Sequence, residues 1–392
     1  MRIIVQKYGG KSIGTIPDIK KVAKSIVKRH KSGEGLVVVV SAMADSTDKL
    51  LKSAYKVASK PRERELDMLL TAGERISMAL LSMAIWENGA SAISFTGSQS
   101  GIITDYNHTR ARIVEIRANR IIEELQKNRI VIVAGFQGVS GNREITTLGR
   151  GGSDTTAVAL ACALGAERCE IYKDVEGVFT IDPKKYVNAK HLDEINYKVL
   201  FDMTYFGAMV VHSRAVEVAR RHGVPMILTS SIEKGKETMV NSKTFEGSKF
   251  VSVSSKGKVF WITILMKEDI FHSILKELDV LRTDLRNPSV NIENDEVKFT
   301  FWLLPDLKND IKTVKEKFPN AEITVEELGI VAANGFAVAG RTENIEMIIN
   351  RLHDKRIHFR YIGTTNRSIF VLLPREEVSA AESNIHTLLI KA

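Results

Sequence analysis

Gly149-Arg150-Gly151-Gly152-Ser153-Asp154 decides how this sequence is interpreted, together with Lys7-Tyr8-Gly9-Gly10 near the amino terminus. Each run follows a strand-like apolar segment, at 2–6 and at 130–134. Glycine lets backbone N–H groups turn toward a bound anion, and a helix that starts after such a turn adds its positive end. A lysine, an arginine and an aspartate within the two runs place fixed charges beside these turns. The runs therefore predict a site for phosphoryl transfer.

Neither run is a common nucleotide-binding motif. A Walker motif needs spaced glycines followed by Lys-Ser or Lys-Thr, and a dinucleotide fingerprint needs Gly-x-Gly-x-x-Gly. Both runs lack these patterns. We therefore expect a different phosphate-binding fold.

The composition is that of an ordinary globular protein. The chain has 392 residues, 44% hydrophobic and 26% charged, which is enough for two or three domains. Cys162 and Cys169 lack the spacing of a zinc site or redox motif, so we expect neither a disulfide framework nor a metal cluster. The amino terminus leads directly into a predicted strand, and we expect no signal peptide and no segment that crosses a bilayer. A cytoplasmic protein without membrane contact is the simplest interpretation.

The net charge of +9 has two interpretations. A basic protein can bind nucleic acid, or it can carry a lysine-rich solvated surface. We favour the surface, because the basic residues of 20–29 fall mostly on the polar side of a predicted amphipathic helix. They are not accompanied by a nucleic-acid motif, so we expect no nucleic-acid partner.

Residues 1–232 alternate strand-like and amphipathic helical runs, the pattern of an α/β domain with a mainly parallel sheet. The predicted strands are 2–6, 36–40, 92–95, 130–134, 169–172 and 225–228, and the main helices are 65–88 and 153–164, the latter with Ser153 as N-cap. Ligands bind at the carboxyl ends of the strands in such sheets. Lys7, Ser41, Phe136 and Asp174 follow strands closely, so we expect them to converge on one cleft.

The last third of the chain has a different pattern. A polar segment at 233–249 predicts a linker between domains. Residues 250–392 then repeat a βαβ-like pattern about twice, which predicts two small α+β modules. The predicted strands and helices are 259–266, 270–278, 297–303, 307–317, 345–353, 368–373 and 376–389.

Further motifs occur with the order and spacing of one known family. They are Thr47-Asp48-Lys49-Leu50, Thr71-Ala72-Gly73-Glu74, Thr96-Gly97-Ser98-Gln99, Gly135-Phe136-Gln137-Gly138, Asp174-Val175-Glu176-Gly177-Val178-Phe179, Asp182-Pro183-Lys184 and His212-Ser213-Arg214. With the two glycine-rich runs, they make the chain resemble the aspartokinases, which belong to the amino acid kinase superfamily and carry carboxyl-terminal ACT domains. The resemblance implies an amino acid kinase catalytic domain at 1–232, with a mainly parallel sheet sandwiched by helices. It implies a tandem ACT-like, ferredoxin-like regulatory and dimerisation region at 250–392.

The resemblance also implies a reaction. Aspartokinases transfer the γ-phosphoryl group of ATP to the β-carboxylate of L-aspartate, giving 4-phospho-L-aspartate on the route to lysine, threonine, methionine and diaminopimelate. The reaction brings two anions together, the phosphate chain of ATP and the carboxylate of aspartate. Catalysis must therefore come from positioning the two substrates and neutralising their charge. Magnesium is expected as the ATP complex, held by phosphates and water without a dedicated protein ligand. A homodimer or higher homo-oligomer through the ACT-like region is expected.

The resemblance assigns candidate residues to each group of the substrates. Lys7 and Asp154 are the catalytic candidates, with Lys7 on the transferred phosphoryl group and Asp154 orienting Lys7. The forked guanidinium of Arg150 suits the α-carboxylate of aspartate, and Glu74 suits its α-ammonium group. The other candidates are Ser41, Thr47, Phe136 and Ser153 for the substrate, and Lys7, Gly9, Gly10, Asp174, Phe179 and Lys184 for the nucleotide.

Some positions depart from the family pattern. Lys11 and Lys173 stand where hydroxyl residues are usual, and we expect both to alter nucleotide binding. The ACT-like region lacks the usual Pro-Gly at the start of a module's first helix, and Gly340-Arg341-Thr342-Glu343-Asn344 takes that place in the second module. We therefore expect weak or absent inhibition by lysine and threonine.

Other functions stay open from the sequence. A related kinase could act on another carboxylate, such as glutamate or N-acetylglutamate, although Glu74 favours a free α-amino group. A degenerate kinase domain could serve as an amino-acid sensor, although Lys7, Arg150 and Asp154 are intact. Taken alone, Glu74 would be a solvated helix residue and Asp154 a stabilising acid in a first helical turn.

Overall fold

The computed structural model describes residues 1–230, 235–243, 249–281 and 283–390, which divide into two compact units. The first unit contains Met1–Phe179 and Asn188–Phe245, and the second contains Thr180–Val187 and Glu246–Ala392. Residues 233–234 and 244–248 of the linker expected at 233–249 lie outside the described residues. Within that segment, Thr238–Asn241 forms strand β14 of the first unit.

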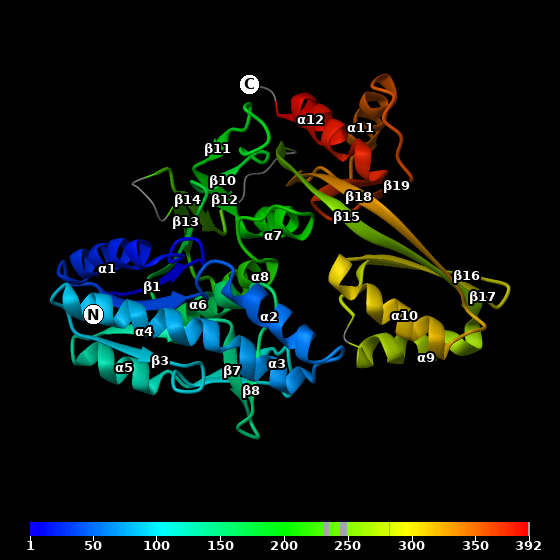
Figure 1. The fold of residues 1–392 in the computed structure, drawn as a ribbon. Coiled ribbons are helices and arrows are strands. Elements are labelled where there is room, and N and C mark those ends of the chain that lie inside the picture. The colour runs from blue at the N-terminus through cyan, green and yellow to red at the C-terminus, as the bar shows by residue number, and fades with distance from the viewer. Residues whose placement is uncertain (231–234, 244–248, 282, 391–392) are drawn as a thin grey trace. The chain divides into compact units, whose positions relative to one another are not determined.

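A mainly parallel sheet forms the centre of the first unit (Figure 1). Among the described residues it has eight strands in the order β12-β14-β13-β9-β1-β2-β6-β3. They are β1 (Ile3–Tyr8), β2 (Gly35–Val40), β3 (Ala92–Phe95), β6 (Ile130–Ala134), β9 (Arg168–Lys173), β12 (Glu194–Asn196), β13 (Met226–Ser230) and β14. Strands β13, β9, β1, β2, β6 and β3 are parallel neighbours, so their carboxyl ends share one edge. The predicted mainly parallel α/β fold is confirmed.

Eight helices of the first unit surround this sheet in its described residues. They are α1 (Ile16–His30), α2 (Ser46–Val57), α3 (Glu63–Leu70), α4 (Ala72–Glu87), α5 (Asn119–Gln126), α6 (Gly152–Ala163), α7 (Tyr197–Tyr205) and α8 (Ser213–His222). Of these, α1, α4, α5 and α6 pack directly on its strands. α1 and α4 share a hydrophobic core with Ile4 of β1 and Leu36 of β2. Side chains alternate along a strand, so Gln6 and Tyr8 face the same way as Ile4, while Lys7 faces α6.

The helix predicted at 65–88 is present as α3 and α4, which meet at Thr71, a residue whose own backbone is helical (φ −63°, ψ −16°). The Thr71 carbonyl keeps the ordinary helical hydrogen bond from the Arg75 N–H (3.3 Å) and accepts a second one from Gln137 Nε2 (3.3 Å). In the described part of the chain, Glu63–Glu87 is one stretch long and apolar enough to cross a membrane by length and composition. Leu81 and other apolar residues of α4 pack in the core of the first unit, as in a core helix of a folded domain.

The first unit also contains short strands that the sequence does not predict. In the described residues they form a four-stranded sheet, in the order β5-β4-β7-β8, and a pair, β10-β11. Their bounds are β4 (Ile102–Thr104), β5 (Ile113–Ile116), β7 (Gln137–Ser140), β8 (Ile145–Thr147), β10 (Val178–Phe179) and β11 (His191–Leu192). Strands of two to four residues are too short to show an alternation in the sequence.

The second unit contains one antiparallel sheet, with six strands in its described residues in the order β16-β17-β15-β18-β20-β19. These are β15 (Lys249–Lys267), β16 (Arg286–Glu293), β17 (Glu296–Leu303), β18 (Glu322–Phe336), β19 (Tyr361–Thr364) and β20 (Ser368–Leu373). The helices are α9 (Glu268–Val280), α10 (Lys308–Lys317), α11 (Thr342–Asp354) and α12 (Val378–Leu389), with short 3₁₀ turns η1 (Pro305–Leu307) and η2 (Arg375–Glu377).

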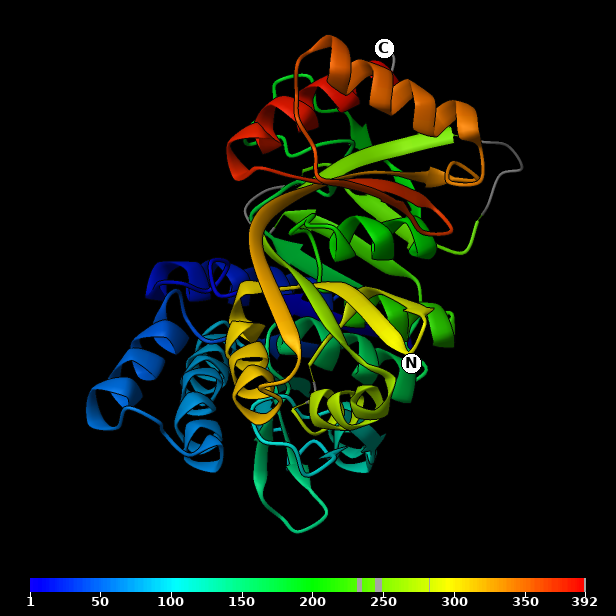
Figure 2. The same cartoon turned by 90° about the vertical axis from the view of Figure 1, so that its right-hand side faces the viewer.

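The long strands β15 and β18 run through both α+β modules of this unit. Figure 2 shows α9 and α10 at one end of these strands and α11 and α12 at the other. Each end has its own hydrophobic core, one around Phe299 and one around Val371. The predicted pair of modules is confirmed, and the structure adds that they share one sheet. The start of β15 pairs with the end of β18 beside β20, so the second module encloses the first along the chain.

The segment Thr180–Val187 packs within the second unit, although the chain on both sides of it belongs to the first. The Val253 N–H donates to the Thr180 carbonyl at 2.8 Å, and Thr180 Oγ1 lies 2.9 Å from His386 Nε2. The Tyr186 hydroxyl donates to Glu382 at 2.9 Å. Strand β15 and helix α12 therefore hold this segment.

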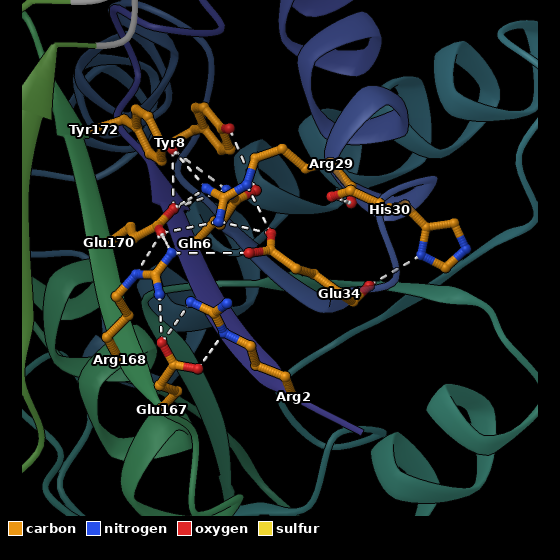
Figure 3. Close-up of polar contacts among 11 residues, drawn as sticks. Arg2, Gln6, Tyr8, Arg29, His30, Glu34, Glu167, Arg168, Glu170 and Tyr172 are labelled. Atoms are coloured by element: carbon orange, nitrogen blue, oxygen red, sulfur yellow. Dashed lines mark hydrogen bonds and ion pairs between the residues drawn. The ribbon is translucent and has the colours of Figure 1, made fainter.

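Charged side chains tie α1 to β1 and β9 on the face opposite Lys7 (Figure 3). Glu170 is buried and accepts hydrogen bonds from Gln6 Nε2 (2.9 Å) and the Tyr172 hydroxyl (2.9 Å). Arg29 of α1 pairs with Glu170 and with Glu34. Burial alone would raise the pKa of Glu170, but hydrogen bonds from Arg29 and Gln6 outweigh burial and lower this pKa. The cluster therefore joins helix and strands through an ionised carboxylate.

We predict that Arg29→Met lowers the free energy of unfolding by about 2 kcal/mol, because the buried Glu170 carboxylate loses its charged hydrogen bonds from Arg29 and keeps Arg168 at 2.8 Å as a cation. Urea unfolding followed by circular dichroism measures the change. Arg2→Met is the matched control, since Arg2 pairs with Glu167 at an exposed position and should change the midpoint far less. Identical midpoints for Arg29→Met and wild type would contradict the stabilising role of the cluster.

Candidate active site

Lys7 and Asp154 form an ion pair between the sheet and α6. The Lys7 Nζ atom lies 2.6 Å from Asp154 Oδ1, and the two side chains are only 6% and 4% exposed. Burial lowers the pKa of Lys7, and the pull of Asp154 opposes this effect. Burial would raise the pKa of Asp154, but the ammonium groups of Lys173 and Lys7 outweigh burial and hold this pKa well below its ordinary value. Asp154 is therefore a carboxylate.

Asp154 also binds groups from two other parts of the first unit. Lys173, the last residue of β9, places its Nζ atom 2.9 Å from Asp154 Oδ2. The backbone N–H of His212 donates to the same oxygen at 3.2 Å. Sequence reasoning noted Lys173 as a departure and did not include it among the site residues. One carboxylate thus gathers β1, β9 and the chain just before α8.

The turn after β1 runs close to the turn after β2. The Ser41 N–H donates to the Tyr8 carbonyl at 3.2 Å, and the Ala44 N–H donates to the Gly10 carbonyl at 3.1 Å. A Cβ atom on Gly10 would lie 2.6 Å from the Ala42 carbonyl oxygen, so only glycine fits. A Cβ atom on Gly9 would lie 3.6 Å from Lys7 Nζ, which places bare backbone beside the ammonium group. Such a surface fits a phosphate chain.

Glu74 reaches the same turn from α4. Its Oε1 atom accepts a hydrogen bond from the Ala42 N–H at 3.1 Å. Its Oε2 atom is buried and has no hydrogen-bond partner among the described residues. Burial raises the pKa of Glu74 to about 7, although the hydrogen bond from Ala42 acts in the opposite direction. A buried carboxyl group with one unpartnered oxygen can accept from an ammonium group.

The start of α6 packs against the turn after β6. A Cβ atom on Gly135 would lie 2.8 Å from Ser153 Cβ, so this turn also requires glycine. Phe136 has a φ of 69°, which is strained for a side chain, and its N–H donates to Thr156 Oγ1 at 3.1 Å. The prediction that Ser153 is the N-cap of α6 is wrong, because Gly151 takes that place with left-handed backbone (φ 71°). Ser153 instead lies buried in the first turn of the helix.

The structure places the other predicted residues as follows. Thr47 is half-buried in the first turn of α2, and Arg150 is exposed in the turn before α6. Asp174 accepts from Lys11 Nζ at 2.9 Å, with the Lys11 side chain 78% exposed. Phe179 in β10 packs edge-to-face on His191. Lys184 belongs to the second unit, and its assignment to the nucleotide stays a prediction.

Two residues without a predicted role hold the chain just before Gly149. Arg214 donates to the Leu148 carbonyl at 2.7 Å and to the Ala111 carbonyl at 3.2 Å. Asp67 of α3 is fully buried and accepts from Thr147 Oγ1 at 2.5 Å. Arg214 stands in a motif that the sequence analysis quoted, whereas Asp67 carries no pattern that marks it.

The sequence of this chain is similar to those of known kinases. The amino acid kinase family matches residues 2–230. The aspartokinase of Mycolicibacterium smegmatis is 39% identical over 98% of this chain and 96% of its own length, and that of Geobacillus stearothermophilus is 36% identical over 98% and 97%. This chain belongs to the aspartokinases. The resemblance noted in the sequence is confirmed, and the protein is a kinase of the amino acid kinase family.

A solved structure shows the same fold. Escherichia coli aspartokinase III in complex with aspartate and ADP has a TM-score of 0.83, covering 100% of both chains at 22% identity. At this identity the likeness concerns the fold alone.

We predict that Glu74 titrates near pH 7 in the free protein, because its carboxyl group is buried with one oxygen unpartnered. Carbon-13 NMR of glutamate-labelled protein should show one carboxyl signal that moves near pH 7 and is absent from Glu74→Gln. Exposed glutamates titrate at about 4.3 and provide the internal comparison. A spectrum of Glu74→Gln that keeps every signal titrating near neutrality would contradict the assignment.

Proposed function

We propose that this aspartokinase transfers the γ-phosphoryl group of ATP to the β-carboxylate of L-aspartate, giving ADP and 4-phospho-L-aspartate. The observation that carries the proposal is the buried Lys7–Asp154 ion pair beside the glycine-rich turns of the parallel sheet. The names of the relatives, which are aspartokinases along almost the whole chain, support it.

The reaction requires alignment and charge neutralisation more than proton transfer. A β-carboxylate oxygen attacks the γ-phosphorus, and the bond from that phosphorus to the oxygen bridging the β-phosphate breaks. The bridging oxygen keeps the electron pair as ADP leaves. The attacking carboxylate is already ionised at neutral pH, so no general base is needed. Lys7 offsets the charge on the phosphoryl group as it moves, and Asp154 holds Lys7 in place.

The amino-acid end of the substrate suits Glu74 and Arg150. Glu74 Oε2 accepts a hydrogen bond from the α-ammonium group, which gives a partner to a buried oxygen that has none among the described residues of the free protein. Arg150 binds the α-carboxylate through two parallel N–H groups. Ser41, Thr47, Phe136 and Ser153 complete the substrate side. An N-acetylated amino acid offers no ammonium group and should not satisfy Glu74.

The nucleotide end suits the turns after β1 and β9. Gly9 and Gly10 present backbone to the phosphates, and Asp174, Phe179 and Lys184 are assigned to the rest of the nucleotide. Magnesium bound with ATP supplies further neutralisation of phosphate charge, and its ligands are phosphates and water.

The wider role follows from the family. We propose a cytoplasmic enzyme that begins the synthesis of lysine, threonine, methionine and diaminopimelate. Residues 1–232 form the catalytic domain, and the tandem ACT-like region at 250–392 assembles a homodimer or larger homo-oligomer. The paired α+β modules of the second unit support this assignment.

We predict aspartate-dependent ATP turnover that yields an acyl phosphate, which hydroxylamine traps as a hydroxamate. Lys7→Ala should reduce the rate at least about 100-fold, because it removes a cation from the transition state. Lys20→Ala, on the exposed face of α1, is the control and should keep the wild-type rate. Glutamate and N-acetylglutamate are tested in parallel. A hydroxamate formed with either of them and not with aspartate would favour a related carboxylate kinase, and no product with any acid would favour a sensor.

We further predict that kcat/KM for aspartate falls about tenfold from pH 8 to pH 6 at saturating Mg-ATP. The pKa of Glu74 is about 7, so lowering the pH protonates the carboxylate that the α-ammonium group needs. The aspartate itself does not change its charge in this range. Glu74→Gln should have a lower kcat/KM that no longer depends on pH here. An unchanged pH profile in Glu74→Gln would remove Glu74 from substrate binding.

A further inference from the structure

We propose that Lys173 is a second catalytic lysine, which leaves Asp154 on nucleotide binding and contacts the terminal phosphates of ATP beside Lys7. This inference rests on the proposed function. It concerns a residue for which the sequence predicts only altered nucleotide binding, and to which the reaction as described above gives no catalytic role.

The strand register places Lys173 on the same side of the sheet as Lys7. Ile171 of β9 pairs with Lys7 of β1 in the parallel ladder, and Lys173 lies two residues further along β9. Side chains two residues apart point to the same face of a strand. Both ammonium groups therefore reach α6, and the one from Lys173 comes from the very end of its strand, where ligands bind in such sheets.

The two lysines differ in their access to solvent. The Lys7 side chain is 6% exposed, whereas that of Lys173 is 21% exposed. Lys173 is thus the more accessible of the two cations. A phosphate chain that enters beside the glycine turns can therefore reach Lys173 while Lys7 keeps its bond to Asp154.

Asp154 can release Lys173 without losing all of its partners. Its Oδ1 atom keeps Lys7 at 2.6 Å, and its Oδ2 atom keeps the His212 N–H at 3.2 Å. A buried carboxylate that lost its last cation would be strongly destabilised, and this arrangement avoids that loss. Lys7 cannot leave Asp154 as readily, because its side chain is more buried than that of Lys173.

The charge balance also favours an anionic ligand. Two ammonium groups against one carboxylate leave one net positive charge in the group formed by Lys7, Asp154 and Lys173, whereas Lys7 and Asp154 alone would be neutral. Excess positive charge in a partly buried position attracts an anion and stabilises charge that develops on phosphate oxygens during transfer. The adjacent Asp174 is paired with Lys11 at 2.9 Å, so it leaves Lys173 to Asp154 and the ligand.

The test compares Lys173→Met with Lys173→Arg and with Lys198→Met, an exposed lysine on α7 that serves as the charge-matched control. Calorimetry measures binding of Mg-AMP-PNP, a non-hydrolysable ATP analogue, and of AMP. We expect Lys173→Met to weaken AMP-PNP about tenfold, to leave AMP unchanged and to lower kcat about 100-fold. Lys173→Arg should recover most of the affinity, and Lys198→Met should match wild type. These binding measurements need no aspartate, so they remain informative even if the acceptor acid is another one.

A positioning role through Asp154 alone makes different predictions. In that case Lys173→Met would have no further effect on AMP-PNP affinity in an Asp154→Asn background, whereas direct contact with phosphate predicts an additional loss there. Thermal unfolding of each variant verifies that it is folded before its affinity is compared. Equal losses for AMP and AMP-PNP, or wild-type kcat and affinity in Lys173→Met, would overturn the proposal.

Discussion

The first unit depends on one buried carboxylate. Asp154 neutralises Lys7 inside the protein, where an unpaired ammonium group would be very unfavourable. The same carboxylate binds Lys173 and the His212 N–H, so strands β1 and β9 and the chain before α8 are all oriented by α6. The ion pairs of Asp154 therefore have two effects. They place the cations of the candidate active site, and they join α6 to strands β1 and β9 of the sheet.

Strands β1 and β9 carry charge on both of their faces. Toward α6 they present Lys7 and Lys173, and toward α1 they present Gln6 and Glu170 with Arg29. Strands buried on both faces of a parallel sheet are usually apolar throughout. Here a slip of one residue in register would exchange the two sets of side chains and leave buried charges without partners. The polar groups thus specify the register of this strand pair more strictly than apolar side chains would.

Much of this arrangement can be predicted from the sequence because it follows local rules. The strands at 92–95, 130–134 and 368–373 agree with the structure to the residue, since each is a short apolar run. Lys7 and Asp154 meet because both stand next to glycine turns that the parallel sheet brings to one edge. Lys173 could not be assigned in the same way, since its role depends on the register between β1 and β9. The N-cap at Gly151 cannot be predicted because left-handed backbone there leaves no pattern in the residues that follow. The sharing of β15 and β18 depends on pairings between residues 57 to 87 positions apart, from Leu265–Glu322 to Lys249–Phe336.

The placement of Thr180–Val187 limits how this protein can be divided. Thr180 and Tyr186 are bound by Val253, His386 and Glu382, all of which come much later in the chain. A gene fragment that ends before β15 would encode the segment 180–187 and omit Val253, His386 and Glu382, which bind it. A chimaera that exchanges the carboxyl-terminal region of this chain with that of a relative therefore has to exchange residues 180–187 as well. The two segments form one unit although Asn188–Phe245 of the first unit separates them in the chain.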